Sequence, residues 1–272
     1  MHIIDGKSRA NEILSEIAKE ISDTRAKVKL VVVQVGDDPA SSVYVRNKER
    51  AAEKVGIETD TRKLPFGVNQ DKLIRIIRSL NADKSVNGIL VQLPLPDHID
   101  TNAVLDAIDP IKDVDGFHES NMGRLWTGRS RLVPCTPAGI MDLLSEFELA
   151  GKNALVVGRS NIVGKPIAQM LLDADATVTL AHSKTNNLDD LLKNADIVIA
   201  AVGIPEFVKT CKDNAVVIDV GINRDENDRL VGDVKRDLEC FAKTVVPGGV
   251  GPMTVAMLMK QTYDAYRLQK GM

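Results

Sequence analysis

Short apolar runs alternate with amphipathic repeats along most of this chain, and this alternation limits the folds that it can adopt. The segment KLVVVQVG (29–36) is apolar enough for a buried strand. The segment SSVYVRNKERAAEKVG (41–56) has the spacing of an amphipathic helix, with Ser41 able to cap its start and Gly56 able to end it. Buried strands that alternate with helices predict a mostly parallel sheet covered on both faces. The expected fold class is therefore α/β.

The alternation occurs in two sets, separated by a polar, turn-rich stretch that ends at PCTP (134–137). The first set predicts helices at 8–21, 41–56, 71–80 and 102–108 and strands at 29–36, 59–64 and 88–96. The second set predicts a helix at 138–147 and strands at 153–157, 177–181, 196–200 and 215–220. The final segment is helical and has no strand after it, so we expect it to return to the first domain.

Two sets of this kind predict two α/β domains with a cleft between them, the second domain being a Rossmann-type parallel sheet. The expected substrate domain is 1–136 plus 253–272, and the expected nucleotide domain is 137–252.

Composition and charge exclude several classes of function. A chain of 272 residues with a net charge of −3 offers no basic surface, so we expect no nucleic-acid partner. Its apolar runs are too short to span a bilayer and its N-terminus lacks the apolar stretch of a signal peptide, which predicts a cytoplasmic protein without a membrane partner. The widely spaced Cys135, Cys211 and Cys240 fit reduced thiols and give no metal-ligand spacing, so no metal is expected.

The segment LVVGRSNIVGKP (155–166) predicts a phosphate-binding turn between a strand and a helix. Gly158 lets the chain leave the strand, and Gly164 allows a close approach of the helix or of a ligand. Pro166 suits the first turn of a helix, where its missing N–H costs nothing. Backbone N–H groups and the helix dipole then favour an anion. The spacing is not the usual G-x-G-x-x-G, and an ordinary turn between strand and helix is the alternative interpretation.

The next strand ends in TLAHSKT, and this ending bears on the choice of dinucleotide. NAD sites usually place a carboxylate there to bind the adenosine ribose, whereas this segment has none. Ser183 and Lys184, with Arg159 in the preceding turn, would instead attract a 2′-phosphate. The residues therefore favour NADP, although a solvated lysine beside a capping serine would also explain them. The later glycine-rich endings DVGIN (219–223) and PGGVGP (247–252) can bring bare backbone against a ligand.

Four residues of the first set are candidates for chemistry. Tyr44 and Lys48 are four residues apart and share one helix face. Gln92 is a polar side chain inside an apolar strand, and Asp115 lies in the acidic turn KDVDGFH. Each residue also has an ordinary interpretation, since exposed lysines and Asp-Gly turns are common.

Seven segments together resemble a known family. They are YVRNKERAAEKVGI, GILVQLPLP, KDVDGFH, GRSNIVGKP, AHSKT, DVGINR and PGGVGPMT, in the family's order and spacing. The chain thereby resembles, over nearly its whole length, the bifunctional methylenetetrahydrofolate dehydrogenase/cyclohydrolase family, usually called FolD. Two departures are an alanine before His182, where cysteine is frequent, and a short, charged GDVKRDLECFAKTVVPGG segment.

The resemblance implies NADP-dependent oxidation of 5,10-methylenetetrahydrofolate and hydrolysis of the methenyl product to 10-formyltetrahydrofolate, within one-carbon metabolism and purine biosynthesis. It also implies a cytoplasmic homodimer with a small-molecule folate substrate. By the same resemblance Tyr44 stacks on the folate, Lys48 is the catalytic residue, Gln92 tunes it, and Asp115 holds the pterin. The implied cofactor residues are Gly158, Arg159, Ser160, Gly164, Ser183 and Ile222.

The residue chemistry is compatible with these roles. A desolvated lysine can have its pKa lowered enough to act as a base near neutral pH. A carboxylate can accept two parallel hydrogen bonds from a pterin.

Two other functions stay open. One is another two-domain NADP dehydrogenase, such as a shikimate or amino-acid dehydrogenase, which VQLPLP and PGGVGPMT disfavour. The other is a protein that binds NADP without turnover, in which the set Tyr44, Lys48, Gln92 and Asp115 would be hard to explain.

Overall fold

The computed structural model describes the backbone of residues 1–272 and the side chains outside 39–42. The chain divides into two compact units. The first unit comprises Asn11–Cys135 and Val255–Met272, and the second unit comprises Met1–Ala10 and Thr136–Thr254. Two long helices, α1 (Gly6–Thr24) and α9 (Val250–Lys270), each contribute residues to both units.

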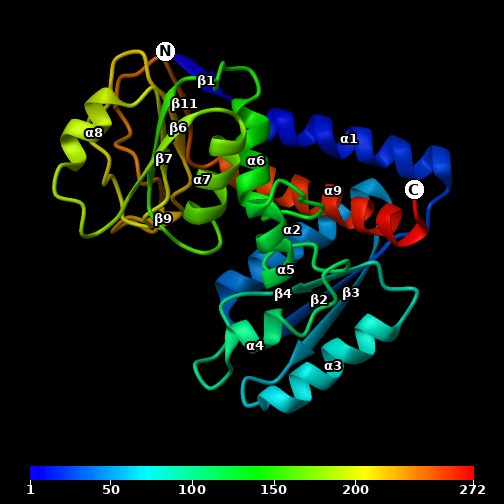
Figure 1. The fold of residues 1–272 in the computed structure, drawn as a ribbon. Helices are drawn as coiled ribbons and strands as arrows, with labels where there is room; N and C mark the ends of the chain where they lie inside the picture. Colours follow the sequence, from blue (N-terminus) through cyan, green and yellow to red (C-terminus); the bar gives the residue numbers. More distant parts are fainter. The chain divides into compact units, whose positions relative to one another are not determined.

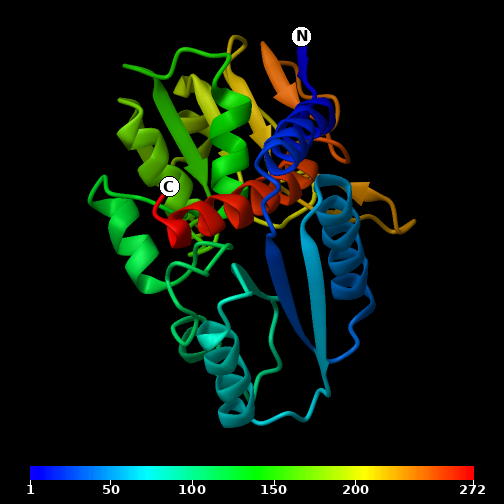
Figure 2. The same cartoon turned by 90° about the vertical axis from the view of Figure 1, so that its right-hand side faces the viewer.

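The first unit contains a three-stranded parallel sheet. Its middle strand β2 (Lys29–Val35) pairs with β3 (Glu58–Leu64) on one side and with β4 (Gly88–Val91) on the other. The connecting helices are α2 (Pro39–Val55) and α3 (Gln70–Ala82). The crossover through α2 runs from β2 to β3, and the crossover through α3 runs back in the opposite direction from β3 past β2 to β4. Right-handed crossovers therefore put α2 and α3 on opposite faces of the sheet, as Figures 1 and 2 show.

Apolar side chains of β2, α3 and β4 make the core on one face of this sheet. Leu73 and Ile77, one turn apart on α3, are fully buried against β2 and β4. Asn69 caps α3, since its side chain accepts a hydrogen bond from the Lys72 N–H at 2.8 Å. The short helices α4 (Thr101–Leu105) and α5 (Glu119–Trp126) follow β4 along the chain. This core holds β4 in place, and so it also fixes where the chain leaves the strand after Val91.

The second unit is a six-stranded parallel sheet in the order β1-β11-β8-β7-β5-β6. Its central strands are fully buried and rich in β-branched residues, as expected for a sheet covered on both faces. The strands are β1 (His2–Ile4), β5 (Asn153–Val157), β6 (Thr177–Ala181), β7 (Ile197–Ala200), β8 (Val216–Asp219) and β11 (Ala242–Thr244). The helices of this unit are α6 (Cys135–Leu144), α7 (Gly164–Asp173) and α8 (Leu188–Asn194), with a hairpin of β9 (Asn223–Arg224) and β10 (Leu230–Val231).

The α/β class with a Rossmann-type parallel sheet is confirmed, and the structure differs from the sequence-based expectation in several elements. The strand expected at 88–96 ends at Val91, because Pro94 and Pro96 have no N–H to donate to a ladder. Neither β1 nor β11 was predicted, since three residues are too few to show a period. Because β1 pairs with β11, the first ten residues belong to the second unit rather than to the expected substrate domain. The proposed helix cap Ser41 lies outside the described side chains.

None of the helices in the described part of the chain is both long and apolar enough to cross a membrane.

Candidate active site

Lys48 and Gln92 are joined by a hydrogen bond in the first unit. The Lys48 ammonium on α2 donates to Gln92 Oε1 at 2.9 Å. Gln92 is the first residue after β4, where its backbone N–H donates to the carbonyl of Val33 at 2.9 Å. Its side-chain Nε2 donates to the Leu93 carbonyl at 2.7 Å, so the amide can present only its oxygen to Lys48. The end of the strand therefore fixes the position of the lysine nitrogen.

The charge on Lys48 is partly desolvated. Burial lowers the pKa of this lysine from its ordinary value, and the negative charge of Asp115 opposes that shift. The side chain is half-buried, so water still reaches it. The neutral amine, which can accept a proton, is therefore more populated near neutral pH than it is in an exposed lysine.

Asp115 shares this environment. Burial raises its pKa to about 6, with the positive charge of Lys48 opposing and the negative charge of Asp113 adding to the shift. A hydrogen bond with the Cys135 thiol also favours the carboxylate. At neutral pH Asp115 is therefore mostly ionised but close to its titration range.

Gln261 of α9 holds the backbone around Asp115, and nothing in the sequence pattern singled it out. Its Nε2 donates to the carbonyls of Val114 at 3.1 Å and Val133 at 2.5 Å, and it lies 3.1 Å from Cys135 Sγ. Its Oε1 accepts from the Val133 N–H at 2.7 Å. A buried polar residue on a helix otherwise lined by apolar residues was the available signal, because such an amide needs partners.

Tyr44 lies one turn before Lys48 on α2, with its ring 40% exposed. The structure therefore groups Tyr44, Lys48, Gln92 and Asp115 within the first unit. The ring offers a flat apolar surface that an aromatic ligand could cover.

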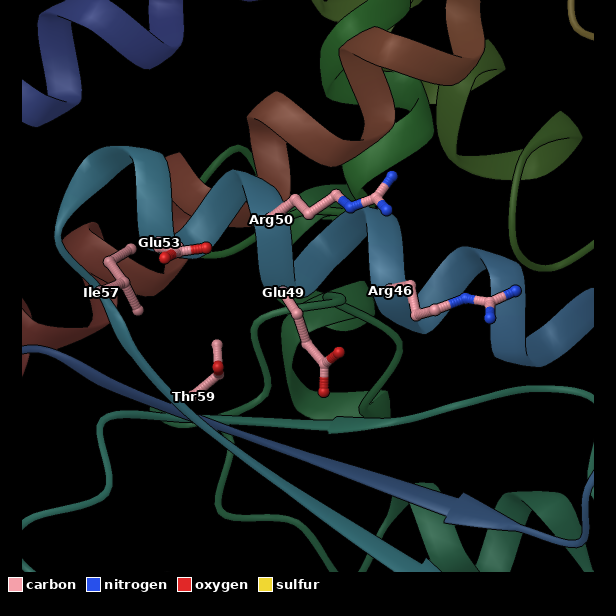
Figure 3. Close-up of a pocket in the computed structure, with 6 residues that line it drawn as sticks. All are labelled: Arg46, Glu49, Arg50, Glu53, Ile57 and Thr59. Carbon is pink, nitrogen blue, oxygen red and sulfur yellow. The ribbon is translucent and has the colours of Figure 1, made fainter.

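A separate pocket of about 380 Å³ lies along another face of α2 (Figure 3). Arg46, Glu49, Arg50 and Glu53 project from the helix, and Ile57 and Thr59 complete the wall. These residues alternate in charge and do not include Tyr44 or Lys48. The pocket is thus distinct from the group around Lys48.

In the second unit, Gly158 and Gly164 make a turn that no larger residue fits. Gly158 has φ +118°, and a Cβ there would come within 2.1 Å of the Ala201 carbonyl oxygen. A Cβ on Gly164 would come equally close to the Gly158 carbonyl oxygen. The strand-to-helix turn is therefore compact, as a cradle for a dinucleotide requires.

Ser160 accepts hydrogen bonds at the start of the helix that follows this turn. Its Oγ accepts hydrogen bonds from the N–H groups of Val163 at 3.1 Å and Gly164 at 3.2 Å. We expected turn N–H groups to face a phosphate, and these two are instead used by Ser160. The exposed guanidinium of Arg159 remains at the turn and can supply positive charge to an anion.

The end of β6 forms a tight turn that presents its polar residues to solvent. The His182 N–H donates to Thr185 Oγ1 at 2.9 Å, and the Lys184 N–H donates to His182 Nδ1 at 3.1 Å. Ser183 and Lys184 are exposed as a result. A hydroxyl and a cation without a neighbouring carboxylate suit a 2′-phosphate, so these residues fit NADP.

Two buried carboxylates that the sequence reasoning missed organise the other loops of this edge. Asp233 accepts hydrogen bonds from the N–H groups of Val202 at 2.6 Å, Gly203 at 2.9 Å and Ile204 at 3.0 Å. It also accepts from Asn223 Nδ2 at 2.8 Å. One side chain thus fixes the loop after β7 to the segment after β8.

Asp219, the last residue of β8, makes the matching contacts. It accepts from the N–H groups of Gly221 at 3.0 Å, Asp233 at 2.8 Å and Val234 at 3.0 Å. Burial raises its pKa to about 6 although these N–H groups favour the ionised form. Next to this network Ile222 is 49% exposed, where an apolar ligand surface could cover it. An aspartate at the end of an apolar strand was the signal in the sequence.

Among the described side chains there is no cluster of three or more His, Cys, Asp or Glu residues able to hold a metal ion.

Comparisons with known proteins match two consecutive parts of the chain to two domains of one family. Residues 4–115 match the model of the tetrahydrofolate dehydrogenase/cyclohydrolase catalytic domain, and residues 134–270 match the model of the NAD(P)-binding domain of the same family. The bifunctional protein FolD of Streptococcus pyogenes serotype M28 is 53% identical, covering 97% of this chain and 96% of the relative.

Two solved structures are similar over nearly their whole length. The bifunctional FolD of Campylobacter jejuni has a TM-score of 0.96 at 43% identity, covering 98% of this chain and 99% of that one. The Trypanosoma brucei FolD, solved with NADP cofactor and inhibitor, has a TM-score of 0.93 at 38% identity, covering 98% of this chain and 97% of that one. With both family models and these relatives spanning it, the chain belongs to the bifunctional tetrahydrofolate dehydrogenase/cyclohydrolase (FolD) family.

Proposed function

We propose that this enzyme oxidises 5,10-methylenetetrahydrofolate with NADP and hydrolyses the resulting 5,10-methenyltetrahydrofolate to 10-formyltetrahydrofolate. The observation that carries the proposal is the desolvated Lys48, held by Gln92 and accompanied by Asp115, inside the unit that matches the family's catalytic domain. The family membership supplies the reaction, and these residues supply the chemistry that it needs.

The oxidation requires positioning more than acid–base catalysis. When bound, NADP accepts the hydride that leaves the methylene carbon. The cation left on that carbon is stabilised by the two substrate nitrogens beside it, so no protein base is needed. Tyr44 can stack on the aromatic part of the folate and thereby orient the methylene carbon.

The hydrolysis requires a base, and Lys48 meets the requirement. Water must add to the methenyl carbon and lose a proton. A neutral Lys48 amine donates one N–H to Gln92 Oε1 and keeps its lone pair for the proton of the water. Because Gln92 is a neutral amide, it fixes the lysine without raising its pKa as a carboxylate would.

Asp115 is suited to bind the pterin ring. Its carboxylate can accept parallel hydrogen bonds from a ring N–H and the exocyclic amine. Gln261 holds the backbone beside Asp115 through the Val114 carbonyl, and the Cys135 thiol hydrogen-bonds with the Asp115 carboxylate. These contacts keep the two carboxylate oxygens in a fixed direction.

The second unit is suited to hold NADP. Gly158 and Gly164 give the compact turn, and Ser160 fixes the start of α7 behind it. Arg159 and Ser183 can bind the 2′-phosphate. Ile222, beside the Asp219 and Asp233 network, can cover an apolar face of the cofactor.

The same family membership supports three wider expectations. The enzyme acts in the cytoplasm as a homodimer, and its 10-formyl product serves purine biosynthesis.

The first test supplies purified protein with 5,10-methylenetetrahydrofolate and NADP and follows NADPH together with the methenyl and 10-formyl products. We expect NADPH to form and the 10-formyl product to appear faster than in buffer. Lys48→Met should reduce the hydrolysis at least about 100-fold, the usual contribution of a general base. Lys54→Met, which removes an exposed lysine of the same helix, is the matched control. A wild-type rate of hydrolysis in the Lys48 variant would show that this residue is not the base. Absence of NADPH formation by the wild-type protein would contradict the proposed oxidation of the folate.

Folate binding should weaken as the pH falls through about 6, because the acceptor carboxylate of Asp115 is protonated below that value and ionised above it. The measurement is the Kd of the folate, without NADP, between about pH 5 and pH 8. Asp115→Asn should bind about 10- to 100-fold more weakly at pH 8 and lose the pH dependence, because a charge-assisted pair contributes about 1.5–3 kcal/mol. An unchanged pH dependence in this variant would assign the titration to another group.

Ser183→Asp should weaken NADP more than NAD, because the new carboxylate repels a 2′-phosphate. A preference lost by about 10- to 100-fold in Kd corresponds to about 1.5–3 kcal/mol. Asn214→Asp adds the same charge to the loop before β8, at the opposite edge of the sheet, and should leave the preference unchanged. Equal loss for both cofactors would mean that the 2′-phosphate binds elsewhere.

Asp233→Asn should weaken NADP about 10- to 100-fold, because an amide NH₂ replaces an oxygen that accepts backbone N–H groups of the loop after β7. The folate Kd should stay unchanged, since these contacts lie within the second unit. Asp237→Asn removes an exposed carboxylate near by and is the control. Retention of wild-type NADP affinity would show that the loop holds its position without Asp233.

A further inference from the structure

Cys211 and Cys240 meet at the amino-terminal edge of the second unit's sheet. Cys211 lies in the loop before β8, and Cys240 lies just before β11. The two strands are adjacent and parallel, so the loops that enter them are neighbours. Both cysteines are free thiols, although 28 other residues separate them along the chain.

The two thiols are in contact. Cys211 Sγ lies 3.5 Å from the carbonyl oxygen of Glu239, the residue that precedes Cys240. The Cys211 thiol is also a hydrogen-bond partner of the Cys240 sulfur. Both side chains pack in the same apolar cluster of this unit. The two sulfurs are therefore neighbours, as formation of a disulfide requires.

Cys240 is reached from outside through a pocket. The residue is 7% exposed, and it lines a cavity of about 510 Å³ that is large enough for a small oxidant. Lys243 lines the same cavity, with its ammonium held by the carbonyls of Arg236 at 2.9 Å and Leu238 at 2.8 Å. The other charged groups of the cavity wall are Arg236, Asp213, Asp237, Glu239 and the amino terminus at Met1, whose positive charge also acts on Cys240.

This environment assigns different roles to the two sulfurs. The hydrogen bond from Cys211 lowers the pKa of Cys240 to about 7, and the positive charge of Lys243 adds to the effect against the opposing effect of burial. The same hydrogen bond raises the pKa of Cys211, as do burial and the charge of Asp213. Cys240 is thus the more easily ionised thiol, and Cys211 is the protonated neighbour.

Cys135 provides the contrast within the same chain. It is 1% exposed, and burial together with the charge of Asp115 raises its pKa well above the ordinary value. A buried protonated thiol reacts slowly with oxidants.

We propose that Cys240 and Cys211 form a peroxide-sensitive thiol pair, a modification site outside the residues of catalysis and cofactor binding, in which oxidation closes an intramolecular disulfide. The Cys240 thiolate attacks one oxygen of hydrogen peroxide, the O–O bond breaks, and the products are a Cys240 sulfenic acid and hydroxide. The Cys211 sulfur then attacks the sulfenic sulfur, and the proton of Cys211 leaves with the displaced hydroxide as water. Overall two thiols and one peroxide give one disulfide and two waters, with two electrons passing to the peroxide.

The disulfide would cross-link the second unit without touching its cofactor residues. Cys211 and Cys240 precede their strands, whereas Gly158, Ser183 and Ile222 follow theirs, so the two sets lie at opposite edges of the sheet. Oxidation is therefore expected to leave the dehydrogenase rate within about twofold. It is expected to raise the Tm of the protein by several degrees, because the closed loop restricts the unfolded chain.

The test treats the full-length protein with hydrogen peroxide, quenches it, alkylates the remaining thiols and maps the peptides by mass spectrometry. We expect one peptide pair joined through Cys211 and Cys240, sensitive to a reductant, while Cys135 is recovered as an alkylated thiol. In Cys211→Ser the disulfide cannot close, and the Cys240 sulfenic acid should be trapped by a dimedone-type reagent. A joined pair that includes Cys135, or the absence of any Cys211–Cys240 pair, would overturn the proposal.

A second measurement does not depend on the cross-link. The rate of alkylation of Cys240 against pH should have its midpoint near 7 in the wild-type protein. In Cys211→Ala the midpoint should move upward, because the hydrogen bond that favours the Cys240 thiolate is removed. A midpoint unchanged by this substitution, with the fold verified by circular dichroism, would show that Cys211 does not activate Cys240.

Discussion

Parallel strands end at the same edge of a sheet, and this constraint decides where several of the candidate site residues of both units lie. Gln92 follows β4, Gly158 follows β5 and Ser183 follows β6. At that edge the backbone leaves the ladder, so its side chains and N–H groups are available to a ligand. The buried apolar strands position the polar residues, and the loops supply the chemistry.

The residues around Lys48 show how a lysine can be held in place while its charged form is disfavoured. An exposed Lys48 would be protonated at neutral pH, and a Lys48 paired with a close carboxylate would be more so. Gln92 instead holds the lysine through a neutral oxygen, while burial disfavours its charge. Burial likewise raises the pKa of Asp115 to about 6 from an ordinary value of 3.8, which costs the folded protein roughly 3 kcal/mol at neutral pH. The burial of Asp115 therefore lowers the stability of the folded protein at neutral pH.

The sequence was informative where the local backbone conformation or burial can be satisfied by one type of residue. The glycines at 158 and 164 could be recognised because a strand-to-helix turn without Cβ atoms needs them, and the structure leaves no room for another residue. The apolar strands could be recognised because fully buried parallel strands are continuously apolar. The site residues Tyr44, Lys48, Gln92 and Asp115 became distinctive only as a set, through the family resemblance.

Residues whose role depends on distant partners could not be found in this way. Gln261 contacts Val133, which lies 128 positions earlier in the chain, and β1 pairs with β11 from the opposite end of the sequence. The hydrogen bonds of Asp233 reach the loop after β7, thirty or so residues earlier. No local period reports such contacts, because hydrogen-bond partners are set by the tertiary fold rather than by neighbours in sequence.

Asp115 and Asp219 both have a pKa of about 6 because both carboxylates are buried, and they differ in which groups oppose the effect of burial. Asp219 has three backbone N–H donors, yet burial still outweighs them. The raised pKa of Asp219 lowers the stability of the folded protein, so stability alone does not explain a carboxylate at this position. Its oxygens occupy the space that a Cβ on Gly232 would fill, and Asp233 does the same beside Gly221. The two aspartates and two glycines interlock, so the segments after β7 and β8 are held in one arrangement, in which Ile222 is exposed.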